Sequence, residues 1–456
     1  MNTAEPSQPT PPVAERVRSV DALRGVDMFW ILGAGIVVKA LEKMGGSVAV
    51  PDPAGAEPAL SFWAGVVKTI STQLQHVTWE GVRFYDFIFP LFLFIVGVSL
   101  VFSLDRTLER EGRAKAVLHI VRRSVLLFLF GVLYTGGLTQ KWPDVALGGV
   151  LHRIAACYLC AALIYVWFAS RWKVIAGIAA SLLVGYWVLL TFVPFPDIEL
   201  RQPEKREVPA QNNVEAVAER IGSHDPAAIS AAVPERVSGL YEEHRNLSNY
   251  LDFRFLPGKK MATYYINEGL LSTLPSIAIC LFGIFAGRLL KSDVNPHRKV
   301  VWLFAMGAAA VLLGCLWAVQ FAAIGFAGGN NGVLLAWHWS FQFPLIKRIW
   351  SSSFVLVASG YSAMMLGLFY YLVDVRKWSR WCEPFVWIGM NPITLYLLSR
   401  VISFTQIARM FVGGDVEAFF DARSPGLGGL VVAMFALGLV FLLAWFLHRR
   451  KIFLRV

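Results

Sequence analysis

The stretch STQLQHVTWEGVRFYDFIFPLFLFIVGVSLVFSL (residues 71–104) places a histidine, His76, a few residues ahead of a long apolar segment. No charged residue occurs from Phe87 to Leu104, so this segment is just long enough to cross a bilayer as a helix. Trp79 lies between the two, at the depth where tryptophan favours the membrane interface. The stretch predicts a membrane helix with a group that exchanges protons near neutral pH at its mouth. A histidine whose ring simply lies among lipid headgroups is the plainer interpretation.

The composition of the whole chain indicates a polytopic membrane protein. Of its 456 residues, 56% are hydrophobic and only 16% are charged, and the mean hydropathy is +0.55. Soluble domains carry about 25% charged residues. The net charge of +11 is distributed in short basic clusters between apolar runs, as in cytoplasmic loops under the positive-inside rule. These clusters have no interleaved aromatic residues, so no nucleic-acid partner is predicted.

The apolar segments predict an all-α polytopic membrane protein with about ten transmembrane helices and both termini in the cytoplasm. Every basic cluster between spans, including the densest at 106–123, then falls on the inside. We expect residues 1–15 to form a disordered N-terminal tail and residues 16–456 to form the transmembrane domain. Residues 194–265 are polar and proline-rich, and we expect them to form a long periplasmic loop with some short helices.

Two groups of polar residues accompany the predicted spans. Asp21, Arg24 and Asp27 are three apart, so they share one helical face as an ion-pair clamp or as part of a site. Asn391, followed by a proline, predicts a break inside the span 383–399. The five cysteines lie in or beside apolar segments without other soft ligands, so no metal site is predicted.

Several stretches match one family together: RVRSVDALRG, HVTWEG followed by DFIFPLFLFIVG, GVLHRIAACY, LPSIAICLFGIFAG, FPLIKRIWSSSFVL, GMNPITLY and the terminal RKIF. In this order they resemble the membrane domain of the heparan-α-glucosaminide N-acetyltransferase family over residues 16–456. They are equally similar to its bacterial relatives, some of which are labelled N-acetylglucosamine-related transporters.

The resemblance implies a transmembrane acetyltransferase of the bacterial inner membrane. Cytoplasmic acetyl-CoA would donate its acetyl group to the amine of glucosamine or of a terminal glucosaminide on the periplasmic side. The family's active-site histidine, in the motif H-x-x-W, corresponds to His76. A histidine suits a general base, and both direct attack and an acetyl-histidine intermediate remain open. Asp86 either orients His76 or pairs with Arg83.

Further residues are candidates for binding the two substrates. For the phosphates of acetyl-CoA, the only cofactor expected, they are basic residues that also fit the positive-inside pattern: Arg24, Arg122 and Arg123. For the acceptor sugar, they are polar or aromatic residues near the outer ends of spans or inside one: Trp79, Glu80, His152, Arg153, His338 and Asn391.

The chain departs from the family pattern at two positions. Gly35 stands where members carry an Asn or Asp that assists the histidine, and Ile346 stands where Asn is common. A polar helper would then come from elsewhere, with Gln73, Gln75 and His338 as candidates, or the activity differs.

Two other functions remain open at this point. Ten spans with a broken helix would also serve a transporter of an amino sugar such as N-acetylglucosamine, although the two halves show no internal repeat. An O-acetyltransferase of a polysaccharide would use the same donor and base. The expected partners are the lipid bilayer and an amino-sugar or glycan acceptor, and the sequence leaves a homodimer open.

Overall fold

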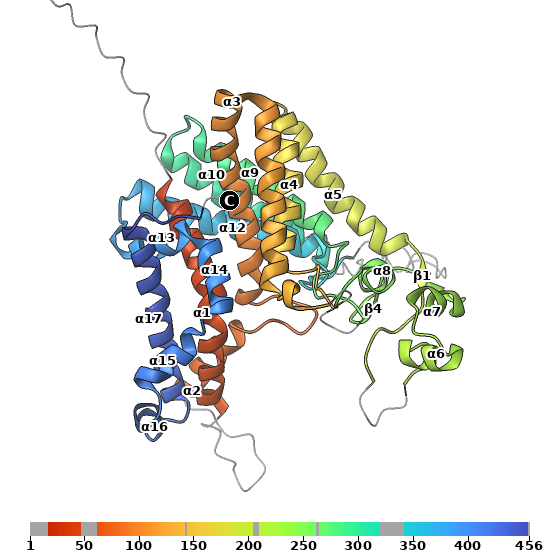
Figure 1. Ribbon diagram of the computed structural model, residues 1–456. Coiled ribbons are helices and arrows are strands. Elements are labelled where there is room, and N and C mark those ends of the chain that lie inside the picture. The colour runs from red at the N-terminus through yellow and green to blue at the C-terminus, as the bar shows by residue number, and fades with distance from the viewer. Residues whose placement is uncertain are drawn as a thin grey trace, which may run out of the picture.

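The computed structural model describes residues 17–46, 62–141, 144–203, 209–260, 264–319 and 342–454. Within them the chain is almost entirely helical, with two short two-stranded ribbons, which confirms the all-α class. The tail expected at 1–15 lies outside the described residues. Figure 1 shows the long helices side by side, with the segment that follows α5 at the lower right.

The longest helix, α3 (Ile88–Tyr134), contains two of the expected spans. Its backbone turns at Gly112, where φ is +79° and ψ is 176°, values that glycine adopts without strain. The basic cluster 106–123 surrounds this turn, at the top of Figure 1. We call this end of the bundle the basic end, and the end that carries residues 194–265 the loop end.

The main core forms where α3 meets α4 (Val150–Phe168), α9 (Thr273–Lys291) and α12 (Ser352–Phe369). Lipid tails are as apolar as leucine, so close packing rather than water exclusion must hold such helices together. Gly97 and Gly283 allow this, because a Cβ on either would come within 2.0 or 2.1 Å of the facing helix's backbone oxygen. Around this core lie α5 (Trp172–Phe192) and α10 (Pro296–Ala318), and a π-helical turn (Tyr370–Val375) extends α12.

A second layer packs around α1 (Arg18–Gly46) and consists of α13 (Glu383–Met390), α14 (Pro392–Val401) and α17 (Leu427–Arg449). The helix break expected at Asn391 is confirmed, since α13 ends and α14 begins on either side of it. Shorter helices follow at the loop end: α2 (Phe62–Gln73), α15 (Phe404–Val412) and α16 (Asp415–Asp421). Short 3₁₀ turns lie at Gly137–Thr139 and Arg380–Cys382.

The segment between α5 and α9 folds on itself at the loop end. It contains α6 (Val214–Ile221), α7 (Pro226–Ala232) and α8 (Leu247–Phe255). β1 (Phe195–Pro196) pairs with β2 (Arg236–Val237), and β3 (Tyr241–Glu242) pairs with β4 (Arg245–Asn246), both antiparallel. Short helices were expected here, and α8 and the chain after it reach the site described below.

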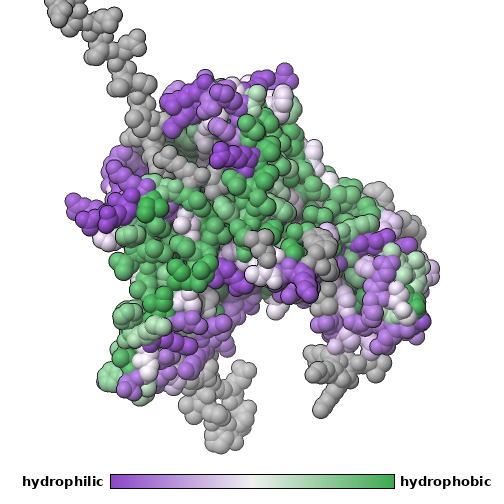
Figure 2. All heavy atoms as spheres, in the orientation of Figure 1, coloured by the Kyte–Doolittle hydropathy of each residue, from purple (hydrophilic) through white to green (hydrophobic). Residues whose placement is uncertain are grey.

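Seven helices in the described part of the chain are long and apolar enough to cross a membrane, or eight if the bent pair α14 and α15 counts as one span. The 51-residue unit 84–134 counts once among them, although Gly112 divides it into two passes. The number ten and the cytoplasmic placement of the termini stay predictions. Figure 2 shows a broad hydrophobic belt with hydrophilic surface above and below it, as a bilayer requires.

Candidate active site

His76 lies in the loop between α2 and α3 and is held by a carboxylate from the 3₁₀ turn Phe84–Phe87. The His76 ring donates from Nδ1 to Oδ1 of Asp86 across 2.7 Å. The Asp86 side chain is fully buried, whereas that of His76 is 47% exposed. Because the carboxylate accepts at Nδ1, the other ring nitrogen, Nε2, is left to take up a proton.

Asp86 is itself fixed by the backbone around it. Its Oδ2 accepts from the backbone N–H of Arg83 at 2.9 Å and of Val77 at 3.4 Å. The Arg83 guanidinium donates instead to the backbone oxygen of His76, at 3.1 Å. The sequence left open whether Asp86 orients His76 or pairs with Arg83. In the structure the Asp86 side chain contacts the imidazole and not the Arg83 side chain. Tyr85 packs on the imidazole, with ring centroids 4.8 Å apart.

A lysine and a glutamate that sequence reasoning missed complete the cluster. Lys347 Nζ lies 3.3 Å from Nδ1 and 3.5 Å from Nε2 of His76, and 3.2 Å from Oε1 of Glu268. Glu268 has a φ of +64°, which is unusual for a residue other than glycine and typical of functional sites. Lys347 stands within the motif FPLIKRIW, but only the fold brings it to a histidine 271 positions earlier.

Backbone pairing explains how Lys347 reaches the histidine. Gly81 donates to the backbone oxygen of Leu345 at 2.9 Å, and Glu80 forms a β-bridge with Ile346. The side chain of Ile346 is fully buried, so an isoleucine fits there without the polar partner that an asparagine would need. Gly35 is exposed, no described residue lies within 4 Å of where its Cβ would be, and a glycine has no side chain that could assist His76.

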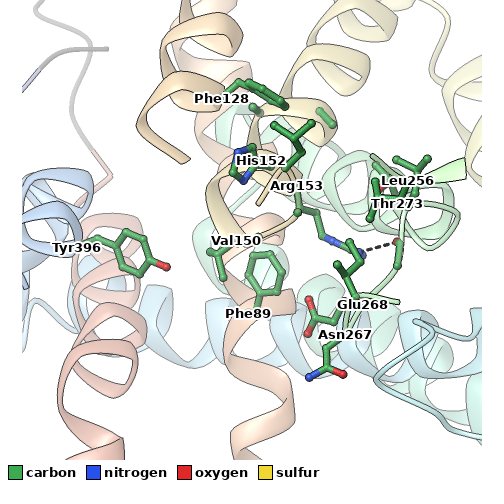
Figure 3. Close-up of a pocket in the computed structure, with 18 of the residues that line it drawn as sticks. Phe89, Phe128, Val150, His152, Arg153, Leu256, Asn267, Glu268, Thr273 and Tyr396 are labelled. Carbon is green, nitrogen blue, oxygen red and sulfur yellow. Dashed lines mark hydrogen bonds between the residues drawn. The ribbon is translucent and has the colours of Figure 1, made fainter. Parts of the chain in front are cut away.

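His76 opens onto a cavity of about 620 Å³, which we call the main cavity. Its polar end contains His76, Lys347, Glu268 and Asn267, and most of its remaining wall is apolar. Figure 3 shows Glu268 and Asn267 at one end and His152 with Phe128 at the other. Across the cavity lies Tyr396 of α14, stacked on Tyr134 of α3 with centroids 4.3 Å apart.

The floor of the main cavity near α9 depends on a buried acid of the loop segment. Asp252 of α8 accepts from the backbone N–H of Leu270 at 2.9 Å and of Ile266 at 3.4 Å, and both residues line the cavity. Burial raises the pKa of the Asp252 carboxyl to about 6 from an ordinary value of 3.8.

A second, smaller pocket of about 280 Å³ lies near the turn of α3, and we call it the basic pocket. Polar and basic side chains dominate its lining: Ser103, Thr107, His119, Arg122, Arg123 and Tyr158. The Arg123 guanidinium lies over the Tyr158 ring, 4.6 Å from its centroid, and its Nε has no hydrogen-bond partner among the described residues. Arg123 lines the basic pocket and the next residue of α3, Ser124, lines the main cavity.

Arg24, predicted to bind the phosphates of the donor, has structural contacts within the bundle. Arg24 donates to Asp21 and to the backbone oxygen of Gly389, both at 3.3 Å, and also to Ser99. It therefore ties α1 to α3 and α13, as the clamp interpretation requires, and lines neither pocket; its assignment to the donor phosphates stays a prediction. Asp27 is buried, and no hydrogen bond to its carboxylate is found in the part of the chain that the structure describes.

Arg153 lines the main cavity, but its N–H groups already have acceptors. It donates to Ser272 Oγ at 2.8 Å, to Ser276 Oγ at 2.9 Å and to the backbone oxygen of Gly269 at 3.0 Å. Its guanidinium also stacks over Trp350, 5.0 Å from the ring centroid. Arg153 therefore connects the start of α9 to α4, and its assignment to the acceptor sugar stays a prediction.

The other residues predicted to bind the acceptor sugar differ in whether they line the main cavity. Trp79 donates to the backbone oxygen of Tyr241 at 2.6 Å, and neither it nor Glu80 lines the main cavity. Asn391 is buried without a described hydrogen-bond partner, also away from that lining. His152 does line the cavity, and His338 lies outside the described residues. Within the described ranges no group of three or more His, Cys, Asp or Glu could hold a metal ion.

Comparison with known proteins identifies relatives of this chain. A family model described as "Heparan-alpha-glucosaminide N-acetyltransferase, catalytic" matches residues 61–198. The heparan-alpha-glucosaminide N-acetyltransferase of Mus musculus is 24% identical over 84% of this chain and 56% of its own length. The protein of that name from Homo sapiens is 23% identical over 97% of this chain and 60% of its own length.

The chain thus spans less than two thirds of the length of these curated relatives. The segment matched by the family model contains His76, Asp86 and both arginines of the basic pocket. The family model and the two relatives agree with the motifs found along the chain, and the chain is similar to members of the heparan-alpha-glucosaminide N-acetyltransferase family.

Proposed function

We propose that this protein is a transmembrane acetyltransferase that moves an acetyl group from cytoplasmic acetyl-CoA to the amine of glucosamine or of a terminal glucosaminide on the periplasmic side. The observation that carries the proposal is the His76–Asp86 pair, with Nδ1 and Oδ1 2.7 Å apart. The pair lies at the polar end of the main cavity, whose lining extends to Ser124, the neighbour of Arg123 in the basic pocket. The names of the two relatives support the amine as acceptor.

The histidine acts as a general base in this proposal. Asp86 accepts a hydrogen bond from the Nδ1–H group of His76, which leaves Nε2 unprotonated in the neutral ring. The acceptor enters as an ammonium, which has no lone pair, so Nε2 must take a proton before or during attack on the thioester carbonyl. The new C–N bond forms as the C–S bond breaks. The second proton lost by the attacking nitrogen passes to the leaving sulfur, and the imidazolium then releases the ammonium proton to solvent.

Lys347 and Glu268 complement this base. The Lys347 ammonium, 3.5 Å from Nε2, is positioned to donate to the carbonyl oxygen as negative charge develops on it. Glu268 lies 3.2 Å from that ammonium and offers a carboxylate to the positively charged amine of an incoming sugar. A sugar's hydroxyls need polar neighbours, and Asn267 provides one at the same end of the cavity.

In this proposal the basic pocket binds the phosphates of the donor. Arg122 and Arg123 face a small polar space together with His119, and arginine suits phosphate because its N–H groups form a planar fork. Arg123 and Ser124 are adjacent on α3, so a donor with its phosphates in the basic pocket could extend an arm into the main cavity.

Acetyl transfer by purified protein tests the proposal. Protein in detergent receives labelled acetyl-CoA and either glucosamine, a glucosamine-terminated oligosaccharide or a sugar that has hydroxyls only. We expect label in a product that survives mild base, since an amide survives where an ester is cleaved. His76→Ala should lower the rate about 10²- to 10⁴-fold, the contribution of a positioned base. His297→Leu, which replaces an exposed histidine at the start of α10, is the matched control.

Two outcomes would contradict the proposal in different ways. A base-labile product would indicate O-acetylation. Sugar uptake into proteoliposomes without a donor, together with no binding of CoA in calorimetry, would indicate a carrier.

A further inference from the structure

His152 on α4 is a buried histidine for which the proposed chemistry has no use. It is 5% exposed and lines the main cavity, at the end away from Glu268 and Asn267 in Figure 3. Neither of its ring nitrogens has a hydrogen-bond partner among the residues that the structure describes. Buried polar groups in native proteins are nearly always satisfied, so this ring calls for a partner that a ligand would bring.

The ring is held by packing, although its nitrogens are unused. It meets Phe128 edge to face, with centroids 4.7 Å apart. A Cβ at Gly131, three residues further along α3, would lie 2.7–3.0 Å from three ring atoms, so only a glycine leaves room for the imidazole here. The imidazole is thus fixed in place, and its two buried nitrogens have no partner among the described residues.

The surroundings of His152 restrict the kind of ligand. The cavity face of α4 continues through Ala155, Ala156 and Leu159, which follow at helical spacing, and Val125 faces it from α3. A sugar surrounded by hydroxyls would leave most of them unpaired against this wall. A chain of methylene groups interrupted by an amide would suit it, because a neutral imidazole offers one donor and one acceptor, as an amide does.

We propose that His152 pairs with an amide group of the donor's pantetheine arm and so positions the thioester for His76. This inference rests on the proposed function, and it moves His152 from the acceptor, where sequence reasoning placed it, to the donor. The arm carries two amides between methylene segments, and it must cross the apolar part of the main cavity if its phosphates lie beside Arg123. His152 is then a positioning residue and accepts no proton from the amine.

Binding of CoA, measured by calorimetry, tests the inference with three variants. His152→Leu removes the hydrogen bond to the amide and should weaken binding roughly 2- to 12-fold, the contribution of one such bond. His152→Gln keeps a donor and an acceptor but cannot titrate, so it should bind within a few-fold of wild type. Gly131→Ala should weaken binding while His152 is present, because the new methyl group displaces the ring. His297→Leu, at an exposed position, should have no effect.

S-acetylpantetheine, which lacks the nucleotide, gives an independent readout. As a donor it should lose the same factor in kcat/KM as acetyl-CoA when His152 is replaced by leucine, because the lost contact is to the arm. Wild-type affinity in a folded His152→Leu protein would overturn the inference. Equal losses in the leucine and glutamine variants, with a changed pH profile, would also overturn it and indicate proton transfer by His152. If wild-type protein bound no CoA, the proposed function would fail as well, which separates the two failures.

Discussion

Replacing Asp86 with asparagine should abolish most acetyl transfer while leaving the binding of CoA intact. The reason is the number of hydrogen bonds that the carboxylate accepts. One oxygen accepts from His76, and the other accepts from the backbone N–H groups of Arg83 and Val77. An asparagine has one carbonyl oxygen, so it can serve one side only. Facing its oxygen toward the two backbone donors leaves fewer conflicts, and its NH₂ group then faces Nδ1 of His76.

This arrangement inverts the tautomer of the imidazole. Nδ1 would accept from the amide, so Nε2 would carry the proton and could no longer act as a base. The expected loss in kcat is about 10²- to 10⁴-fold, the range for a positioned general base, and it should not exceed the loss in His76→Ala. Stability should fall by about 1–3 kcal/mol at most, the cost of one unsatisfied buried contact.

The assay is acetyl transfer to glucosamine under saturating donor, with the folded state checked by size-exclusion chromatography. Asp421→Asn is the matched control, because this carboxylate also accepts from two backbone N–H groups, those of Gly426 and Gly428, and pairs with Lys43. The double variant His76→Ala/Asp86→Asn should be no slower than His76→Ala, since the two residues act as a unit. A folded Asp86→Asn protein with wild-type kcat, or additive losses in the double variant, would refute the reasoning.

Three further predictions follow from the same structure. Single cysteines placed within 209–260 of a cysteine-free protein should react with an impermeant thiol reagent from the periplasm, and those within 106–120 should not; reversed labelling would contradict the proposed direction of transfer. Arg123→Gln should weaken CoA binding roughly 10- to 150-fold in calorimetry and leave sugar binding nearly unchanged. Unchanged CoA affinity in a folded Arg122→Gln/Arg123→Gln protein would leave both arginines with a topological role only. Because the pKa of Asp252 is about 6 in the folded state against an ordinary 3.8, the contribution of Asp252 to stability should be fully present below pH 4 and should be lost, by about 3 kcal/mol, as the pH rises through 6. Thermal unfolding in detergent should show that the stability of wild type relative to Asp252→Asn falls over this pH range, and parallel profiles would contradict the assignment.

The fold class and most helices could be predicted from local composition. A bilayer forces each spanning segment to satisfy its own backbone hydrogen bonds, so an apolar run of sufficient length is a helix whatever surrounds it. The break at Asn391 followed from proline in the same local way. The number of spans was less secure. The helix α1, which contains Asp21, Arg24 and Asp27, is not among the described helices that are long and apolar enough to cross a membrane.

The site was predictable only where its members are close in sequence. His76 and Asp86 are ten positions apart and flank one turn, and Arg122 and Arg123 are neighbours on one helix, so motif and spacing were enough to propose them as pairs. Lys347 could not be found in this way, since it reaches the histidine through a β-bridge between distant loops.

The remaining polar residues show why local patterns could not assign their roles. Arg24, Arg153 and His152 all look like unpaired polar groups near a membrane in the linear chain. The fold provides hydrogen-bond acceptors for both arginines and gives the histidine none among the described residues. Whether a buried polar group is structural or available to a ligand depends on what other helices bring to it. Helix packing decides which side chains surround a buried polar group, and the sequence of one helix does not determine this packing.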